Sequence, residues 1–222
     1  SIARRLSGYW DDISGQGNHG TFQLGTPTYS SSDGGTFEFS GSQWVDLGED
    51  SNFGLGTDPF SVEIWFYRNT GNQGTHSSLL SLTKNVSSGH IQDSNFQLMC
   101  HQDHNFKIYM GVRDNNSSGN EHLFDTVIPE ETWTHVVYVR EGTGANQCKC
   151  YINGVVESST YQMNYTMTNS NPRFMIATNR AANYHHAGKI SQTRVYKGKG
   201  FSASDVQHNF DAMKGRYLDK PL

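Results

Sequence analysis

The sequence is poor in cysteine, in long apolar runs and in clustered charge, and each shortage excludes a class of protein. Its three cysteines are Cys100, Cys148 and Cys150. Three thiols cannot supply the paired framework that stabilises small secreted domains. Cys148 and Cys150 stand two apart on a predicted strand, so they share a face and are poorly placed to bond to each other. We therefore expect free, buried thiols and a fold stabilised by its core.

Charge and hydropathy exclude two kinds of partner. The chain has 17 basic and 21 acidic residues and a net charge of −4, and no basic run offers the positive face of a nucleic-acid-binding domain. No apolar stretch approaches the roughly 20 residues that span a bilayer. The first residues also lack the pattern of a secretory signal, and we expect the sequence to be a piece of a longer chain. We thus predict neither nucleic-acid binding nor membrane insertion.

What the sequence does have is aromatic residues (12%), 23 glycines and alternating apolar positions. In the segment 60–67 the even-numbered residues 60 to 66 are apolar and share one face, while Trp65 and Tyr67 occupy the other. Segment 134–140 repeats the pattern, and Asn153-Gly154 between two apolar runs predicts a type I′ hairpin. Further strands are expected at 36–39, 44–47, 78–82, 95–100, 106–112, 148–152, 155–156, 173–177 and 189–196. Short strands at this frequency predict a β-sandwich.

One helix is expected near the end of the sequence. Ser202 can cap it, with Asp205 three residues on, and Val206, Phe210 and Met213 form one apolar stripe. Gly215 should stop it.

Four segments, in order along the chain, resemble the laminin-G-like branch of the concanavalin A-like lectin/glucanase superfamily. They are 10–21 (WDDISGQGNHGT), 37–47 with 60–65, 133–137 with 151–154, and 188–206. The resemblance implies an all-β, two-sheet antiparallel jelly-roll sandwich with one short C-terminal helix. We expect a single domain over 1–222 with its core at about 9–217. Because aromatic side chains dominate core energetics, Trp65 and Trp133 are expected to be core or inter-sheet anchors and not platforms for a ligand.

The closing stretch 206–216 (VQHNFDAMKGR) is similar to the ends of such domains in bacteriophage structural proteins, many of them marine or cyanobacterial. This narrower resemblance implies a virion module, either a capsid decoration or a tail component. Its partners would be other virion or parent-protein subunits, and its location the virion surface or the extracellular space.

The resemblance also implies a structural Ca²⁺ in the opening loop, held by Asp12, with Asn18 as a second candidate. Such a hard cation takes six to eight oxygen ligands, and Ser191 and Gln192 stand where relatives often carry two carboxylates. The alternative is that Asp12 only forms a turn, and both interpretations stay open.

A soft-metal site is less favoured. Cys100, His101 and His104 lie close together in the sequence, but zinc needs four ligands. We expect the tip of a surface hairpin there.

Ligand binding is expected in the segment 179–186. This segment combines amide, aromatic and guanidinium side chains, which are the types that bind sugar rings and hydroxyl groups. The candidate residues are Asn179, Arg180, Tyr184, His185 and His186. A second polar stretch, 113–122, is expected to be a mobile loop.

No pair of acids spaced for glycoside hydrolysis is present, since Glu63 is isolated and Glu130 and Glu131 lie in a predicted turn. The sequence therefore predicts a non-catalytic, lectin-like virion module that adheres to host cell-surface glycans. The alternatives are a glycan-binding module of a secreted carbohydrate-active protein and, more weakly, a glycoside hydrolase or lyase.

Overall fold

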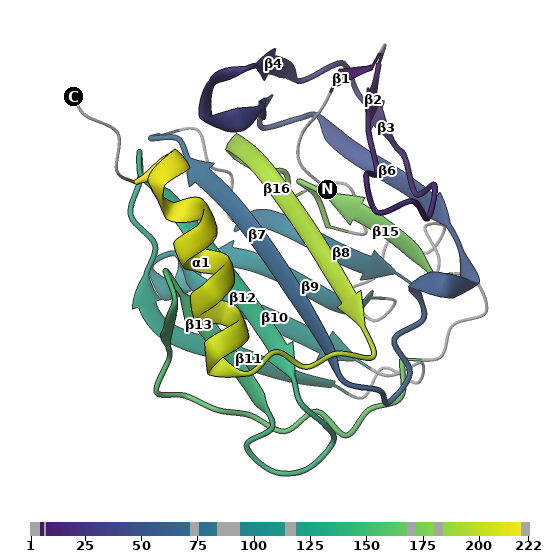
Figure 1. Cartoon of the computed structure of the whole chain (residues 1–222), viewed down its shortest axis with the longest axis vertical. Coiled ribbons are helices and arrows are strands. Elements are labelled where there is room, and N and C mark those ends of the chain that lie inside the picture. Colours follow the sequence, from purple (N-terminus) through teal and green to yellow (C-terminus); the bar gives the residue numbers. More distant parts are fainter. Residues whose placement is uncertain are drawn as a thin grey trace.

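The computed structural model describes residues 5–6, 8–71, 76–83, 94–113, 119–167, 172–179 and 184–218. Two antiparallel sheets lie face to face, with one helix outside them (Figure 1). In spatial order the nine-stranded sheet contains β1 (Arg5–Leu6), β2 (Tyr9–Trp10), β3 (Gly20–Gln23), β6 (Trp44–Glu49), β15 (Arg173–Ile176), β8 (His76–Thr83), β9 (Ser94–His101), β10 (Lys107–Arg113) and β11 (Gly119–Val127). The seven-stranded sheet contains β14 (Val155–Val156), β13 (Cys148–Ile152), β12 (Trp133–Arg140), β7 (Phe60–Arg68), β16 (Ala187–Lys197), β5 (Thr36–Ser40) and β4 (Thr28–Ser30).

Short helical elements join or follow these strands. They are the 3-10 turns η1 (Ser32–Gly34), η2 (Ser51–Phe53) and η4 (Gln102–His104), and the helix α1 (Ala203–Tyr217). None of the helices in the described part of the chain has the length and apolar composition needed to cross a bilayer.

The core lies between the two sheets and is strongly aromatic. Phe60 stacks on Phe96 at 6.1 Å between ring centroids, and Trp10 packs on Phe37 at 5.1 Å. The three cysteines are free and buried, as the sequence predicts. Because aromatic side chains bury large apolar areas, this layer supplies most of the driving force for folding.

Part of the outer face of the seven-stranded sheet, at β7 and β12, is covered by α1 (Figure 1). Tyr217 stacks on Trp65 at 4.3 Å and Phe210 stacks on the same ring at 5.8 Å. Trp133 packs against Tyr217 as well, at 4.9 Å. Both tryptophans lie in a buried cluster, as predicted, but this cluster lies between the seven-stranded sheet and α1, so the prediction of inter-sheet anchors is wrong.

The sandwich, the hairpin and the helix cap are confirmed. Asn153 and Gly154 both have positive φ, of 50° and 81°, and Ile152 pairs with Val155 across them. Ser202 and Asp205 form a capping box.

Two local predictions are wrong. The helix runs past Gly215, because the contacts of Tyr217 outweigh the roughly 1 kcal/mol that glycine costs in a helix. The polar stretch predicted as a loop becomes strand β11 from Gly119 on, paired with β10; residues 114–118 lie outside the described part.

Candidate functional site

A pocket opens on the outer face of the nine-stranded sheet, over β8 to β11, with a volume of about 160 Å³. Strand alternation explains its lining: Phe96, Leu98 and Cys100 of β9 point into the core, so Gln97 and His101 point outwards. We call it the sheet pocket, and it is lined by His76, Gln97, Met99, His101, Tyr109, Gly111, Arg113, Glu121 and Tyr184.

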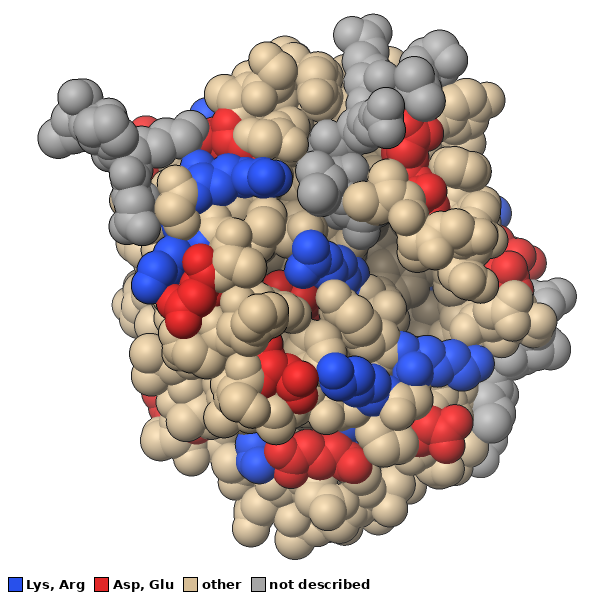
Figure 2. Space-filling view, viewed as in Figure 1, with Lys and Arg blue, Asp and Glu red and all other residues tan. Residues whose placement is uncertain are grey.

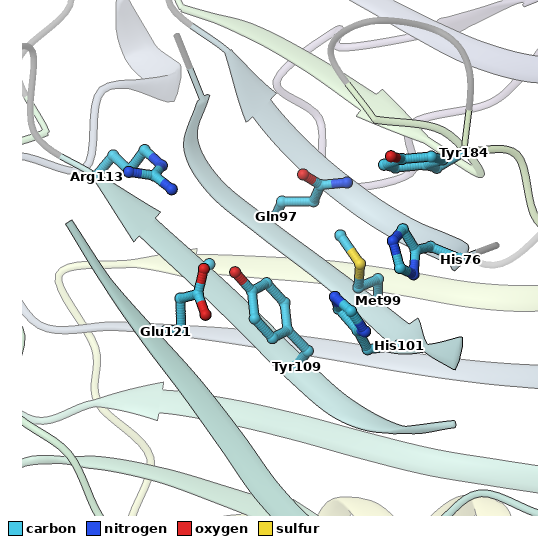
Figure 3. A pocket seen from close by; sticks show the side chains of 9 residues that line it. His76, Gln97, Met99, His101, Tyr109, Arg113, Glu121 and Tyr184 are labelled. Atoms are coloured by element: carbon cyan, nitrogen blue, oxygen red, sulfur yellow. The ribbon is translucent and has the colours of Figure 1, made fainter. Parts of the chain in front are cut away.

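One end of the sheet pocket is aromatic. His76 and His101 stand opposite each other on β8 and β9, with ring centroids 4.0 Å apart. Tyr184 meets His76 edge to face at 4.5 Å, and Tyr109 lies 4.9 Å from His101. Figure 3 shows Tyr184 and the two histidines together at this end.

The other end of the sheet pocket is polar, with Glu121 and Arg113 beside Tyr109 (Figure 3). Burial, followed by a hydrogen bond with Glu121, raises the pKa of Tyr109, so its hydroxyl keeps its proton at neutral pH. Gln97 lies between the two ends, and its Nε2 has no hydrogen-bond partner within the described part of the chain. Buried amides are normally paired, so this donor is available to a bound molecule.

Gly111 leaves room for the ring of Tyr109. A Cβ at Gly111 would lie 2.9 Å from Cε1 and 3.2 Å from the hydroxyl oxygen of Tyr109. The absence of a side chain at residue 111 therefore lets the tyrosine lie across its own strand and form a wall of the pocket.

Tyr184 is held by the segment predicted to bind ligand. Its carbonyl accepts a hydrogen bond from the backbone of Ser78, and two residues before the segment begins Ala177 donates to the carbonyl of Leu79. Both attachments are to β8, and they fix a half-buried tyrosine beside His76.

The other residues predicted for this site have different positions. His186 is fully buried, and burial lowers its pKa to about 4. Its Nδ1 lies 2.7 Å from the Ser77 hydroxyl and its Nε2 lies 3.2 Å from the Tyr67 carbonyl, so the neutral ring joins two strands. Asn179 is buried as well, His185 is half-buried and outside the pocket lining, and Arg180 lies outside the described residues. Of the four predicted residues that the structure describes, Tyr184 alone lines the sheet pocket.

Asp12 organises the opening loop. Its carboxylate accepts hydrogen bonds from the backbone and hydroxyl of Ser14 and from the backbone of Asn18, each at 2.9 Å. Burial acts to raise the pKa of Asp12, but these hydrogen bonds outweigh it and hold the pKa below its ordinary value. Three donors around one carboxylate favour the turn-forming role over a Ca²⁺ ligand, and the calcium site stays a prediction.

A second, larger hollow lies beside this loop, with a volume of about 560 Å³. We call it the edge cleft; its floor is apolar, from Leu55, Phe174 and Ile176, and its rim includes Asp12 and Arg194. Figure 2 shows a hollow to the right of centre, between the parts of the surface where Figure 1 places β16 and β6. On this face Lys and Arg alternate with Asp and Glu, without an extended patch of one sign (Figure 2).

The sheet pocket has the better chemistry for a polar ligand, because it combines ring faces with a carboxylate, a guanidinium and an amide. Most of its residues were missed from the sequence. The alternation of Gln97, Met99 and His101 on one strand face was a usable signal. His76 lies 25 residues before His101 and joins the pocket through the pairing of β8 with β9, which no local sequence pattern predicts.

Several solved structures are similar to this fold. Domain 4 of AbnA, an extracellular arabinanase from Geobacillus stearothermophilus solved with arabinotriose, is 21% identical with a TM-score of 0.64, over 85% of this chain and 86% of that one. The binding domain of botulinum neurotoxin serotype G is 17% identical with a TM-score of 0.66, over 90% of this chain. The binding domain of Paraclostridial Mosquitocidal Protein 1 is 14% identical, also at 0.66, over 94%. This chain spans about half the length of these two toxin domains, 48% and 50%.

No curated protein sequence is similar enough to count as a relative. The family model described as the concanavalin A-like lectin/glucanases superfamily, of the laminin G kind, matches residues 39–207, which is well over half of the chain. The chain belongs to the concanavalin A-like lectin/glucanases superfamily.

Proposed function

We propose that this domain is a non-catalytic glycan-binding module and that the sheet pocket holds the sugar. One observation carries the proposal: Tyr184 and Tyr109 flank an amide, Gln97 Nε2, that has no hydrogen-bond partner among the described residues. A sugar ring has apolar C–H faces and hydroxyl groups around its edge. Aromatic rings pack against the C–H faces, and amide, carboxylate and guanidinium groups hydrogen-bond to the hydroxyl groups.

The polar end of the pocket suits hydroxyl groups. The Glu121 carboxylate is an acceptor and the Arg113 guanidinium a donor, and both line the polar end of the pocket (Figure 3). A pocket of about 160 Å³ is small, and it fits one terminal or branching sugar better than a long chain bound along its length.

The absence of catalysis is part of the proposal. A retaining glycosidase places two carboxylates roughly 5–5.5 Å apart on either side of the bond that it cleaves. The lining of the sheet pocket includes one carboxylate, Glu121, and that of the edge cleft includes one, Asp12. Both are engaged by hydrogen-bond donors of the protein itself.

The similar structures support binding as the role. One is the arabinanase domain with arabinotriose, and another is the ligand-binding domain of botulinum neurotoxin serotype D in complex with N-acetylneuraminic acid. Since the arabinanase is extracellular and the toxin domains bind receptors or ligands, we propose an extracellular or surface location.

A glycan array that includes arabino-oligosaccharides and sialylated glycans tests the proposal. The wild type should bind a defined set of glycans, and Tyr184→Ala should weaken that binding about 10- to 100-fold, the loss expected for one aromatic contact. Tyr9→Ala is the matched control, because Tyr9 is an exposed tyrosine on β2, near the opposite edge of the same sheet. Absence of binding across the array, or equal losses in the two variants, would contradict the proposal.

The virion role is a second proposal, carried by the resemblance of residues 206–216 alone. In the structure this stretch lies in α1 and packs on Trp65 and Trp133. We propose that the exposed side of α1 contacts neighbouring subunits of a virion. Copurification of the full-length parent protein with assembled particles would support this, and a parent protein free of any assembly would refute it.

A further inference from the structure

Three potential metal ligands meet at the aromatic end of the sheet pocket. His76 and His101 are partners across β8 and β9, and Asp103 lies in η4, directly after β9. One ligand atom from each of the three lies within 4.8 Å of those of the other two. Among the described residues, this is the one group of three or more histidine, cysteine, aspartate or glutamate side chains that close together.

The two imidazoles have unused nitrogens. Nδ1 of His76 and Nδ1 of His101 are both buried, and neither has a hydrogen-bond partner in the described part of the structure. Buried polar atoms in native proteins are almost always paired, so an unpaired nitrogen in each of two rings whose centroids lie 4.0 Å apart requires an explanation. A metal ion bound by the two rings would supply one.

We propose that His76, His101 and Asp103 form a binding site for a divalent transition-metal ion of the zinc type, at the end of the sheet pocket. Two imidazoles and one carboxylate are a donor set for zinc, whereas calcium and magnesium prefer oxygen ligands throughout. Two ligands of a tetrahedral zinc ion stand roughly 3.3 Å apart. The three ligand atoms lie within 4.8 Å of one another without an ion, and a bound ion would draw them to the shorter spacing, with the exposed Asp103 moving toward the two rings.

Three protein ligands leave the fourth zinc position open. The lining of the sheet pocket includes both histidines, so a water molecule or an oxygen of a bound molecule can take that position. The sequence had grouped His101 with Cys100 and His104. In the structure Cys100 instead lies in the core, and His76 of the neighbouring strand β8 lies opposite His101.

Titration calorimetry with zinc chloride alone tests the site, using tag-free protein that has been stripped with a chelator. The wild type should bind one ion per chain. His76→Ala and His101→Ala should each weaken binding by at least about tenfold, since changes next to a metal ligand alone cost 10- to 100-fold. His208→Ala, on the exposed surface of α1, is the matched control and should bind like the wild type. Cobalt(II) should give a tetrahedral visible spectrum in the wild type and in His208→Ala only.

Circular dichroism of the metal-free variants verifies that they fold, and His76→Gln and His101→Gln replace the alanine variants if they do not. No zinc binding by the wild type, or equal binding by wild type and both pocket variants, would overturn the site. Because no glycan is present in the titration, its result is independent of the glycan-binding proposal.

Discussion

Glu63 is a buried carboxylate under α1, and its removal should destabilise the fold measurably. The side chain is 0% exposed. Its Oε1 accepts a hydrogen bond from Nε2 of His135 at 3.0 Å, and its Oε2 accepts one from Nδ2 of Asn209 at 3.1 Å. Arg194 also approaches Oε2, at 3.4 Å. Four elements, β7, β12, β16 and α1, thus meet at one acid.

The cost of Glu63→Ala follows from these contacts. In Glu63→Ala the fully buried His135 and the partly buried Asn209 both lose the Glu63 carboxylate as hydrogen-bond acceptor. Each lost hydrogen bond to a charged group lowers the free energy of unfolding by about 1.5–3 kcal/mol. The side chain of Arg194 is 29% exposed and can turn to water, so its share is small. We expect a decrease of about 3–5 kcal/mol in the free energy of unfolding, within the range measured for broken buried ion pairs. For a chain of this size that is a Tm lower by roughly 6–20 °C.

Urea unfolding followed by tryptophan fluorescence measures the effect. Glu141→Ala is the matched control, because Glu141 makes an ion pair with Lys149 in which both side chains are about a third exposed. It should cost less than about 1 kcal/mol. If Glu63→Ala and Glu141→Ala prove equally mild, the helix is not held to the sheet by this acid and the reasoning is refuted.

Two further predictions concern the pocket and acid stability. Gly111→Val should push the ring of Tyr109 out of the sheet pocket, because the new Cβ lies 2.9 Å from that ring, and glycan affinity should fall at least about tenfold. Unaltered affinity in Gly111→Val would show that Tyr109 does not touch the ligand. The pKa of His186 is lowered to about 4 in the folded state, so the unfolded chain binds more protons between pH 6.5 and pH 4, and stability should decrease as the pH falls through this window. From pH 7 to pH 5 this ring should lower the free energy of unfolding by about 2 kcal/mol. When the free energy of unfolding in urea is measured at a series of pH values, His186→Gln should show a dependence on pH that is smaller by that amount. An unchanged pH dependence in the variant would contradict the lowered pKa of His186.

The sequence was sufficient to predict the sandwich. Period-two alternation in 60–67 assigned the even-numbered residues to one face of the strand and Trp65 to the other, and in the structure these two faces contact the inter-sheet core and α1 respectively. Asn153-Gly154 predicted its hairpin because both residues tolerate positive φ. These features are local, since each depends on the chemistry of a few neighbouring residues, and a single sequence contains that information.

Tertiary structure determined the binding surfaces. Tyr184 was predicted, but its neighbours Gln97, Tyr109 and Glu121 come from three strands whose order in the sheet no local pattern reveals. His186, in the same predicted segment, turned out to be buried. Strand pairing decides which distant residues share a face, and packing decides which of them reach solvent; both depend on contacts between residues far apart in the sequence.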